Sequence, residues 1–124
     1  MSYTREQIEV WLPGVWDADR ALNRRDPHAP DEQMPKSKAN PAEGNTKVAM
    51  LADIRQAWRR ATLAQDERQV LLLIFGFDEP VAAAGALLGM DYATTARRRD
   101  SGVEALALAL NGGRPLRDIT REDA

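Results

Sequence analysis

The chain has 124 residues, 44% of them hydrophobic and 29% charged, which is typical of a single globular domain with a modest core. The formal net charge of −2 excludes a globally basic nucleic-acid binder, so any affinity for DNA has to come from local patches. Cysteine is absent, which excludes disulfides and thiolate chemistry, and no apolar run reaches the length of about 20 residues that a membrane span requires.

The amino-terminal stretch MSYTREQIEV contains acidic residues and lacks the apolar core of a secretory signal. We therefore expect a cytoplasmic protein that has no membrane partner.

Residues 1–25 are expected to form amphipathic helices. The apolar residues that recur on one helical face are Ile8, Trp11, Leu12 and Val15. Thr4 and Gln7 have the spacing of a capping box, which favours a helix start at this point. The Pro13–Gly14 pair interrupts the pattern, so it predicts either two short helices or one sharp kink.

The tryptophans of this segment, Trp11 and Trp16, are interpreted as core anchors that pack on the rest of the chain together with Trp58. The alternative is a docking face for a partner, because tryptophan is frequent at binding hot spots.

Residues 26–46 hold four of the seven prolines, and Met34 is their only large apolar residue. We expect a long loop or linker here, with no helix and no core strand. His28, the only histidine, lies in this segment. Because the chain has no second histidine and no cysteine, we expect neither a metal site nor a cofactor.

From residue 47 the pattern becomes helical again, and residues 47–111 are expected to form one helical domain. In KVAMLADIRQAWRRATL the apolar residues recur every three or four positions. Arginines on the other faces of this helix either contact DNA phosphates, which position a protein without conveying sequence, or belong to a solvated surface. These arginines are Arg55, Arg59 and Arg60.

The next segment, QDERQVLLLIFGF, begins with acidic residues, which suit the positive end of a helix dipole. Its apolar run Val70–Phe75 suits either a short strand or a buried helix. Because the neighbouring segments are helical in pattern, we expect a buried helix that ends at Gly76. No segment alternates polar and apolar residues, so the predicted fold class is all-α, with residues 112–124 as a polar tail.

Residues 81–101 have the pattern of two helices joined by a tight turn. Gly85 provides the small residue that close helix packing needs, and Gly89 provides a positive φ in the turn. Met90 follows as an apolar plug and Asp91 as a helix N-cap. This order is that of a helix-turn-helix DNA-binding motif, although an ordinary helical hairpin would share the turn glycine and the cap.

The segment from about Leu63 to Leu106 resembles region 4 of bacterial sigma factors and sigma-like regulators. The matching pieces are DERQVL from Asp66, AGALLG from Ala84, the threonine pair 94–95, the arginine pair 97–98 and SGVEAL from Ser101. The family has aliphatic residues where Thr95 and Arg99 stand, which is a departure from its pattern. Nothing before residue 47 resembles the other promoter-binding region of sigma factors, so the layout resembles small phage late-gene regulators of the RinA and ArpU kind.

If the second helix enters the major groove of DNA, its amino-terminal residues contact the bases. The candidate DNA-binding residues are Tyr92, Thr94, Thr95, Arg97, Arg98 and Ser101. Arg97 and Arg98 are favoured, because they lie opposite the apolar stripe of this helix and a guanidinium group can donate two parallel hydrogen bonds to guanine. Arg99 has the period of the inward-facing residues, so we expect it to pair with an acidic residue of a neighbouring helix.

The sequence therefore predicts a DNA-binding transcription regulator of a phage or prophage, with double-stranded DNA as its partner and no enzymatic activity. Two alternatives stay open. The first is a sigma-like factor that binds RNA polymerase, which the resemblance to sigma region 4 implies. The second is a small terminase subunit that packages DNA as a ring. A homodimer is also open, and the mass in solution would separate a ring from a monomer or dimer.

Overall fold

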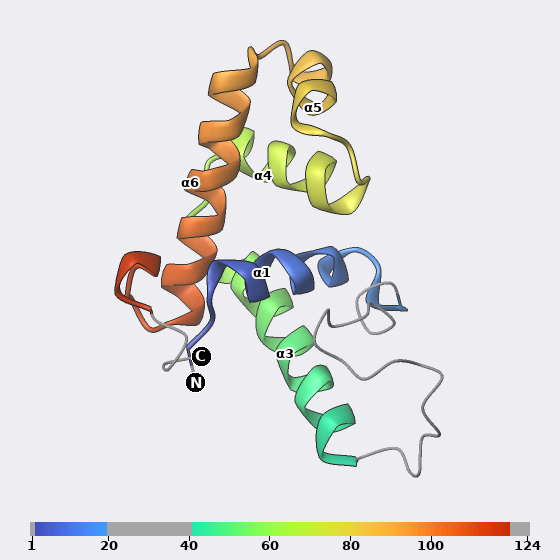
Figure 1. Cartoon of the computed structure of the whole chain (residues 1–124), viewed down its shortest axis with the longest axis vertical. Coiled ribbons are helices and arrows are strands. Elements are labelled where there is room, and N and C mark those ends of the chain that lie inside the picture. The colour runs from blue at the N-terminus through green and yellow to red at the C-terminus, as the bar shows by residue number, and fades with distance from the viewer. Residues whose placement is uncertain (1, 20–40, 120–124) are drawn as a thin grey trace.

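The computed structural model describes residues 2–19 and 41–119, and every regular element among them is a helix (Figure 1). The predicted all-α fold class is therefore confirmed for this part of the chain. Within the same residues, no helix is both long and apolar enough to cross a membrane.

The first helix, α1 (Arg5–Trp11), begins at the predicted capping box. The Thr4 hydroxyl accepts a hydrogen bond from the Gln7 backbone N–H, and the Gln7 side chain accepts one from the Thr4 N–H in return. At the predicted interruption by Pro13 and Gly14, the chain tightens into a short 3-10 helix, η1 (Leu12–Val15).

The long helix α3 (Pro41–Arg60) begins earlier than the sequence pattern predicts. The prediction of a loop extending to residue 46 is wrong for 41–46, because proline is well tolerated at the first position of a helix, where no backbone N–H is required. The remainder of the predicted loop, including His28 and Met34, lies outside the described residues.

Helix α4 (Gln65–Leu71) runs directly into a π-helical turn, η2 (Leu72–Gly76), so helical structure ends at the predicted glycine. The Phe77 N–H donates to the Leu72 carbonyl at 3.1 Å, as the wider turn requires. The predicted burial holds only for Val70 and Leu71; residues 72–76 are partly exposed. The helix therefore buries only the start of its apolar run.

The last part of the described chain contains α5 (Val81–Leu88), α6 (Tyr92–Leu110) and a single 3-10 turn, η3 (Leu116–Asp118). The turn η3 lies in the predicted polar tail, but Leu116 packs against the core and its N–H donates to Glu104 at 3.0 Å. This part of the tail is thus attached to α6.

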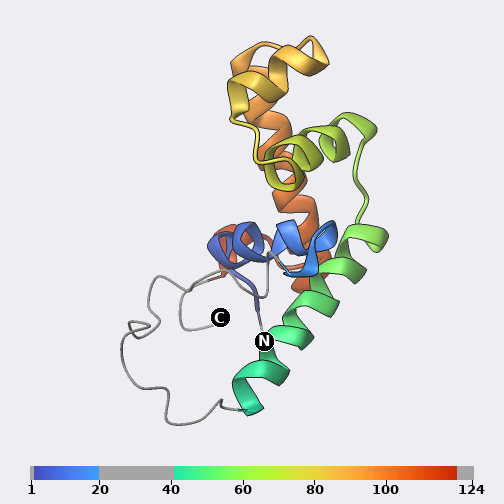
Figure 2. The same cartoon turned by 90° about the vertical axis from the view of Figure 1, so that its right-hand side faces the viewer.

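Helix α6 connects the α5 end of the molecule to the region where α1 and α3 meet, and α3 extends beyond it (Figures 1 and 2). At one end, α1 and α3 pack against its carboxyl-terminal half; at the other, α4 and α5 pack near its start. The main core draws on α1, α3, α4 and α6. Its largest fully buried side chains are Ile8, Leu12, Ile54, Leu71, Val103 and Leu106.

The prediction that the tryptophans serve as core anchors is confirmed. Trp11 is buried in the main core, while Trp16 and Trp58 are partly buried and pack against it. The rings of Trp16 and Trp58 meet edge to face, with their centroids 5.0 Å apart. Such a pair adds to the stabilisation from area burial, so it attaches the η1 region to α3.

Candidate nucleic-acid interface

The turn between α5 and α6 has the geometry that its glycine predicts. Gly89 caps α5 in the left-handed conformation, with φ of 70°. The Met90 N–H donates to the Gly85 carbonyl at 2.8 Å, which satisfies one of the last carbonyls of α5. Met90 itself is only half-buried, and it does not belong to the main core cluster.

The start of α6 is capped by Asp91, as predicted. Its Oδ1 accepts a hydrogen bond from the Thr94 N–H at 2.7 Å. The backbone N–H of Thr94, together with its hydroxyl and the charge of Arg97, holds the pKa of the Asp91 carboxyl below its ordinary value. The cap is therefore charged at neutral pH, where it also complements the helix dipole.

Gly85 is needed because α5 and α6 approach closely at this residue. A Cβ atom placed on Gly85 would lie 2.5 Å from Thr95 Oγ1 and 2.8 Å from the Met90 carbonyl oxygen. Ala84 and Thr95 are fully buried, and neither belongs to the main core cluster. The packing of α5 on α6 thus buries side chains outside that cluster.

The prediction that Thr95 contacts DNA is wrong. Its side chain is fully buried, and its hydroxyl donates to the Asp91 carbonyl at 2.7 Å. The sequence contained a signal for this, because Thr95 shares a helical face with Gly102 and Leu106, seven and eleven residues later.

Three of the other predicted residues lie in the first two turns of α6. Tyr92 is 63% exposed, and Arg97 is also exposed. Thr94 is half-buried, and its hydroxyl accepts a hydrogen bond from Arg97 Nη2 at 3.3 Å. Tyr92 and Arg97 are therefore accessible to a large partner. The hydroxyl of Thr94 holds one terminal nitrogen of the Arg97 side chain.

Arg98, the second favoured arginine, is not a free cation. Its Nε lies 2.8 Å from Oδ2 of Asp66, in the first turn of α4. The other oxygen of Asp66 accepts a hydrogen bond from the Glu67 N–H at 2.8 Å. Asp66 was not identified from the sequence, because it lies 32 positions before Arg98 and only the packing of α4 on α6 brings the two together.

Ser101, also a predicted DNA contact, is exposed, and its hydroxyl makes a hydrogen bond within the protein. Its hydroxyl donates to the carboxylate of Glu67, which is 9% exposed. Glu67 Oε1 in turn accepts a hydrogen bond from the Ala64 N–H at 2.7 Å, at the start of α4. Ser101 therefore links α6 to the first turn of α4, and its hydroxyl proton is engaged by Glu67.

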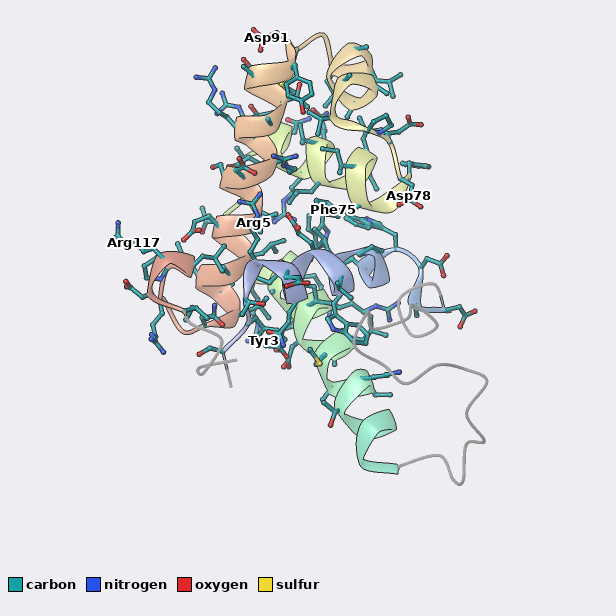
Figure 3. The ribbon with its side chains drawn as sticks, in the orientation of Figure 1. Tyr3, Arg5, Phe75, Asp78, Asp91 and Arg117 are labelled. Atoms are coloured by element: carbon teal, nitrogen blue, oxygen red, sulfur yellow. The ribbon has the colours of Figure 1, made fainter. Side chains whose placement is uncertain are left out.

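Arg99 finds an acidic partner, but not on a neighbouring helix as predicted. Its Nε lies 3.0 Å from Oδ1 of Asp100, the next residue of α6. Asp100 also pairs with Arg5 of α1, which lies against α6 in Figure 3. Partial burial would raise the pKa of Asp100, but the hydrogen bonds from Arg5 and Arg99 outweigh it and hold the pKa below its ordinary value.

The three arginines of α3 differ in their surroundings. Arg55 Nε donates to the Gly14 carbonyl at 3.0 Å, which attaches η1 to α3. Arg59 and Arg60 are exposed and make no hydrogen bond or ion pair with the described residues. Arg60 lines a cleft between the ends of α3 and α6, together with Asp53 and Leu110. Arg59 and Arg60 are therefore the most available of the three predicted phosphate contacts, and Arg55 is exposed but already engaged through Nε.

One apolar feature near the turn was not identified from the sequence. Leu87 of α5 is 66% exposed, and Tyr92, the first residue of α6 after the turn, is 63% exposed. Residues 65–111 hold four arginines and seven acidic residues, so their net charge is −3. The surface near the turn thus combines apolar side chains with a weakly negative background.

Comparison with family models, curated proteins and solved structures finds no match to this chain. Within residues 2–19 and 41–119, no group of three or more His, Cys, Asp and Glu side chains is placed to hold a metal ion.

Proposed function

We propose that this protein binds double-stranded DNA sequence-specifically and regulates transcription, with α5 and α6 as a helix-turn-helix and α6 as its recognition helix. The observation that carries the proposal is the pairing of a tightly packed turn with an open outer face. Gly85 packs on Thr95, Gly89 turns the chain, and Asp91 caps α6. The same arrangement leaves Tyr92 and Arg97 exposed at the start of α6.

These exposed side chains have the chemistry that the major groove requires. Arg97 can donate two parallel hydrogen bonds to guanine or contact a phosphate. Tyr92 offers an aromatic ring for the thymine methyl group and a hydroxyl for a base edge. Arg59 and Arg60 can add phosphate contacts, which position a protein on DNA but do not convey sequence.

The negative charge of the unit shapes the expected binding. With a net charge of −3 over residues 65–111, long-range attraction to DNA is weak. Non-specific binding is therefore expected to be poor at physiological salt, and selectivity has to come from short-range contacts at the start of α6.

The test is selection of a preferred site from a random duplex pool, followed by titration of that site and a scrambled duplex. Arg97→Ala is expected to weaken binding to the selected site by about 1–3 kcal/mol. Arg117→Ala is the matched control, because this exposed arginine lies at the opposite end of α6 from Asp91 (Figure 3). Equal affinity of the parent and Arg97→Ala for the selected site would contradict the proposed interface.

A second candidate is docking on RNA polymerase, and the exposed pair Leu87 and Tyr92 favours it. Two exposed large side chains on either side of the α5–α6 turn, in a unit of net charge −3, suit a protein partner better than a phosphate backbone. Binding of Leu87→Ser to purified polymerase separates the candidates. A loss of polymerase binding with DNA affinity unchanged would favour docking at this surface.

A further inference from the structure

The Asp66–Arg98 ion pair leaves part of the arginine unused. Oδ2 of Asp66 lies 2.8 Å from Nε of the Arg98 guanidinium. The two terminal nitrogens, Nη1 and Nη2, make no hydrogen bond within residues 2–19 and 41–119, and the Arg98 side chain is 46% exposed. A guanidinium held by Nε still presents a pair of parallel donors to a partner.

Asp66 is itself held in one orientation. Its Oδ1 accepts the Glu67 N–H at 2.8 Å, and its position in the first turn of α4 favours a negative charge. Glu67 is fixed in turn by Ser101 of α6 and by the Ala64 N–H. The carboxylate that faces Arg98 is therefore part of the packing between α4 and α6.

This contact changes what Arg98 can bind well. A carboxylate at ion-pair distance offsets the positive charge, so the attraction to phosphate, which depends on charge, decreases. Two parallel hydrogen bonds to O6 and N7 of guanine depend more on the direction of the terminal nitrogens, which the contact at Nε leaves unoccupied. The pairing thus disfavours phosphate and favours a base edge.

From this geometry we infer that Asp66 is a positioning residue that makes Arg98 a contact for guanine in the major groove instead of a contact for phosphate. The inference rests on the proposed DNA-binding function and deepens it. It assigns Asp66 a role in specificity, although Asp66 lies on α4 and outside the proposed recognition helix.

The experiment compares the parent with Asp66→Asn, Arg98→Ala and Arg98→Lys. Each protein is titrated against the selected duplex and a scrambled duplex over a range of salt concentrations. Glu6→Gln is the matched control, because it removes one negative charge from an exposed position of α1. Circular dichroism of each variant establishes that it is folded.

Asp66→Asn is expected to raise the affinity for the scrambled duplex about two- to five-fold, because an exposed ion pair is weak. It should also steepen the salt dependence by about one phosphate contact, a slope change of about 0.9, and lower the ratio of specific to non-specific affinity. Arg98→Ala is expected to lower that ratio about 5- to 100-fold with the salt slope unchanged.

Arg98→Lys keeps the charge but loses the paired donors, so it should bind the scrambled duplex like the parent and lose the preference for the selected site. The inference is overturned if Arg98→Ala weakens both duplexes equally and flattens the salt dependence. It is also overturned if Asp66→Asn changes nothing. In both cases the proposed function stands as long as Arg97→Ala still weakens specific binding. A parent chain that binds no duplex overturns both.

Discussion

At residue 85, the absence of a side chain decides how closely α5 packs on α6. Gly85→Ala is expected to lower the free energy of unfolding by about 1–3 kcal/mol, because its Cβ would overlap Thr95 Oγ1 and the Met90 carbonyl. Chemical denaturation measures the change. Gly89→Asn is the control, because no atom lies near that Cβ position and asparagine tolerates a positive φ. Equal losses at the two glycines would contradict the close approach.

The free energy of unfolding is expected to depend on pH through Asp100, because Arg5 and Arg99 lower the pKa of its carboxyl. A carboxyl whose pKa is lower in the folded state stabilises the fold above its ordinary pKa, and this contribution is lost as pH falls through the lowered value. The side chain is 45% exposed, so we expect at most about 1 kcal/mol.

The measurement is urea unfolding of the parent and Asp100→Asn between neutral pH and pH 2, an interval that spans the ordinary carboxyl pKa of about 4. The parent should be the more stable protein at neutral pH, and the difference should shrink in acid. Glu6→Gln should show a smaller difference at neutral pH. A difference between the parent and Asp100→Asn that stays constant down to the lowest pH would exclude the ionised carboxylate as its source.

Single residues were predictable where their role depends on near neighbours in the chain. The Gly89 turn and the Asp91 cap follow from the order of residues in a short segment. The pairing of Arg98 with Asp66 did not, because it joins side chains from two helices. Thr95 was assigned to the wrong face because its polarity was given more weight than its helical period.

At the scale of elements, Arg68 of α4 closes the end of α3. Its guanidinium donates to the carbonyls of Trp58 at 2.8 Å and Ala61 at 3.3 Å, and lies 4.9 Å from the centroid of the Trp58 ring. Arg68→Ala is expected to cost about 2 kcal/mol of stability, because it removes charged hydrogen bonds and a cation–π contact.

Thermal or chemical unfolding measures this cost. Arg59→Ala is the matched control, because Arg59 is exposed on the same last turn of α3 and makes no hydrogen bond with the described part of the chain. Its effect should stay within about 0.5 kcal/mol. If both substitutions have the same small effect, Arg68 does not cap α3.

Helix boundaries were also predictable where they depend on neighbouring residues, and not where they depend on distant segments. The start of α1 was predictable, because its capping box lies in four consecutive residues. The start of α3 at Pro41 was not, because proline suits both a loop and the first position of a helix. The π-helical turn after Leu71 was also not predictable from the sequence. Gly76 packs there against Trp16, to which a Cβ would come within 3.2 Å, and this neighbour belongs to a distant segment.

At the scale of the whole molecule, the amino-terminal segment and the proposed DNA-binding unit share one core. Ile8 and Leu12 before the undescribed segment pack in the same cluster as Leu71 and Leu106 after it. Tyr3 reinforces the connection: its N–H donates to Asn111 Oδ1 at 2.6 Å, and Asn111 Nδ2 donates to its carbonyl at 3.0 Å. The predicted division at residues 26–46 therefore does not separate two independent cores.

A shared core predicts a single unfolding transition that a substitution in α1 moves as a whole. Ile8 is fully buried, so Ile8→Ala is expected to cost about 2–5 kcal/mol. Tryptophan fluorescence reports on the end that holds all three tryptophans, and far-ultraviolet circular dichroism reports on every helix. Both signals should shift together in Ile8→Ala.

Leu87→Ala, at an exposed position of α5, should leave both signals within about 0.5 kcal/mol of the parent. If fluorescence alone shifted and a second circular dichroism transition kept its midpoint, α4–α6 would unfold independently. That result would contradict a core shared by the amino-terminal helices and the proposed interface.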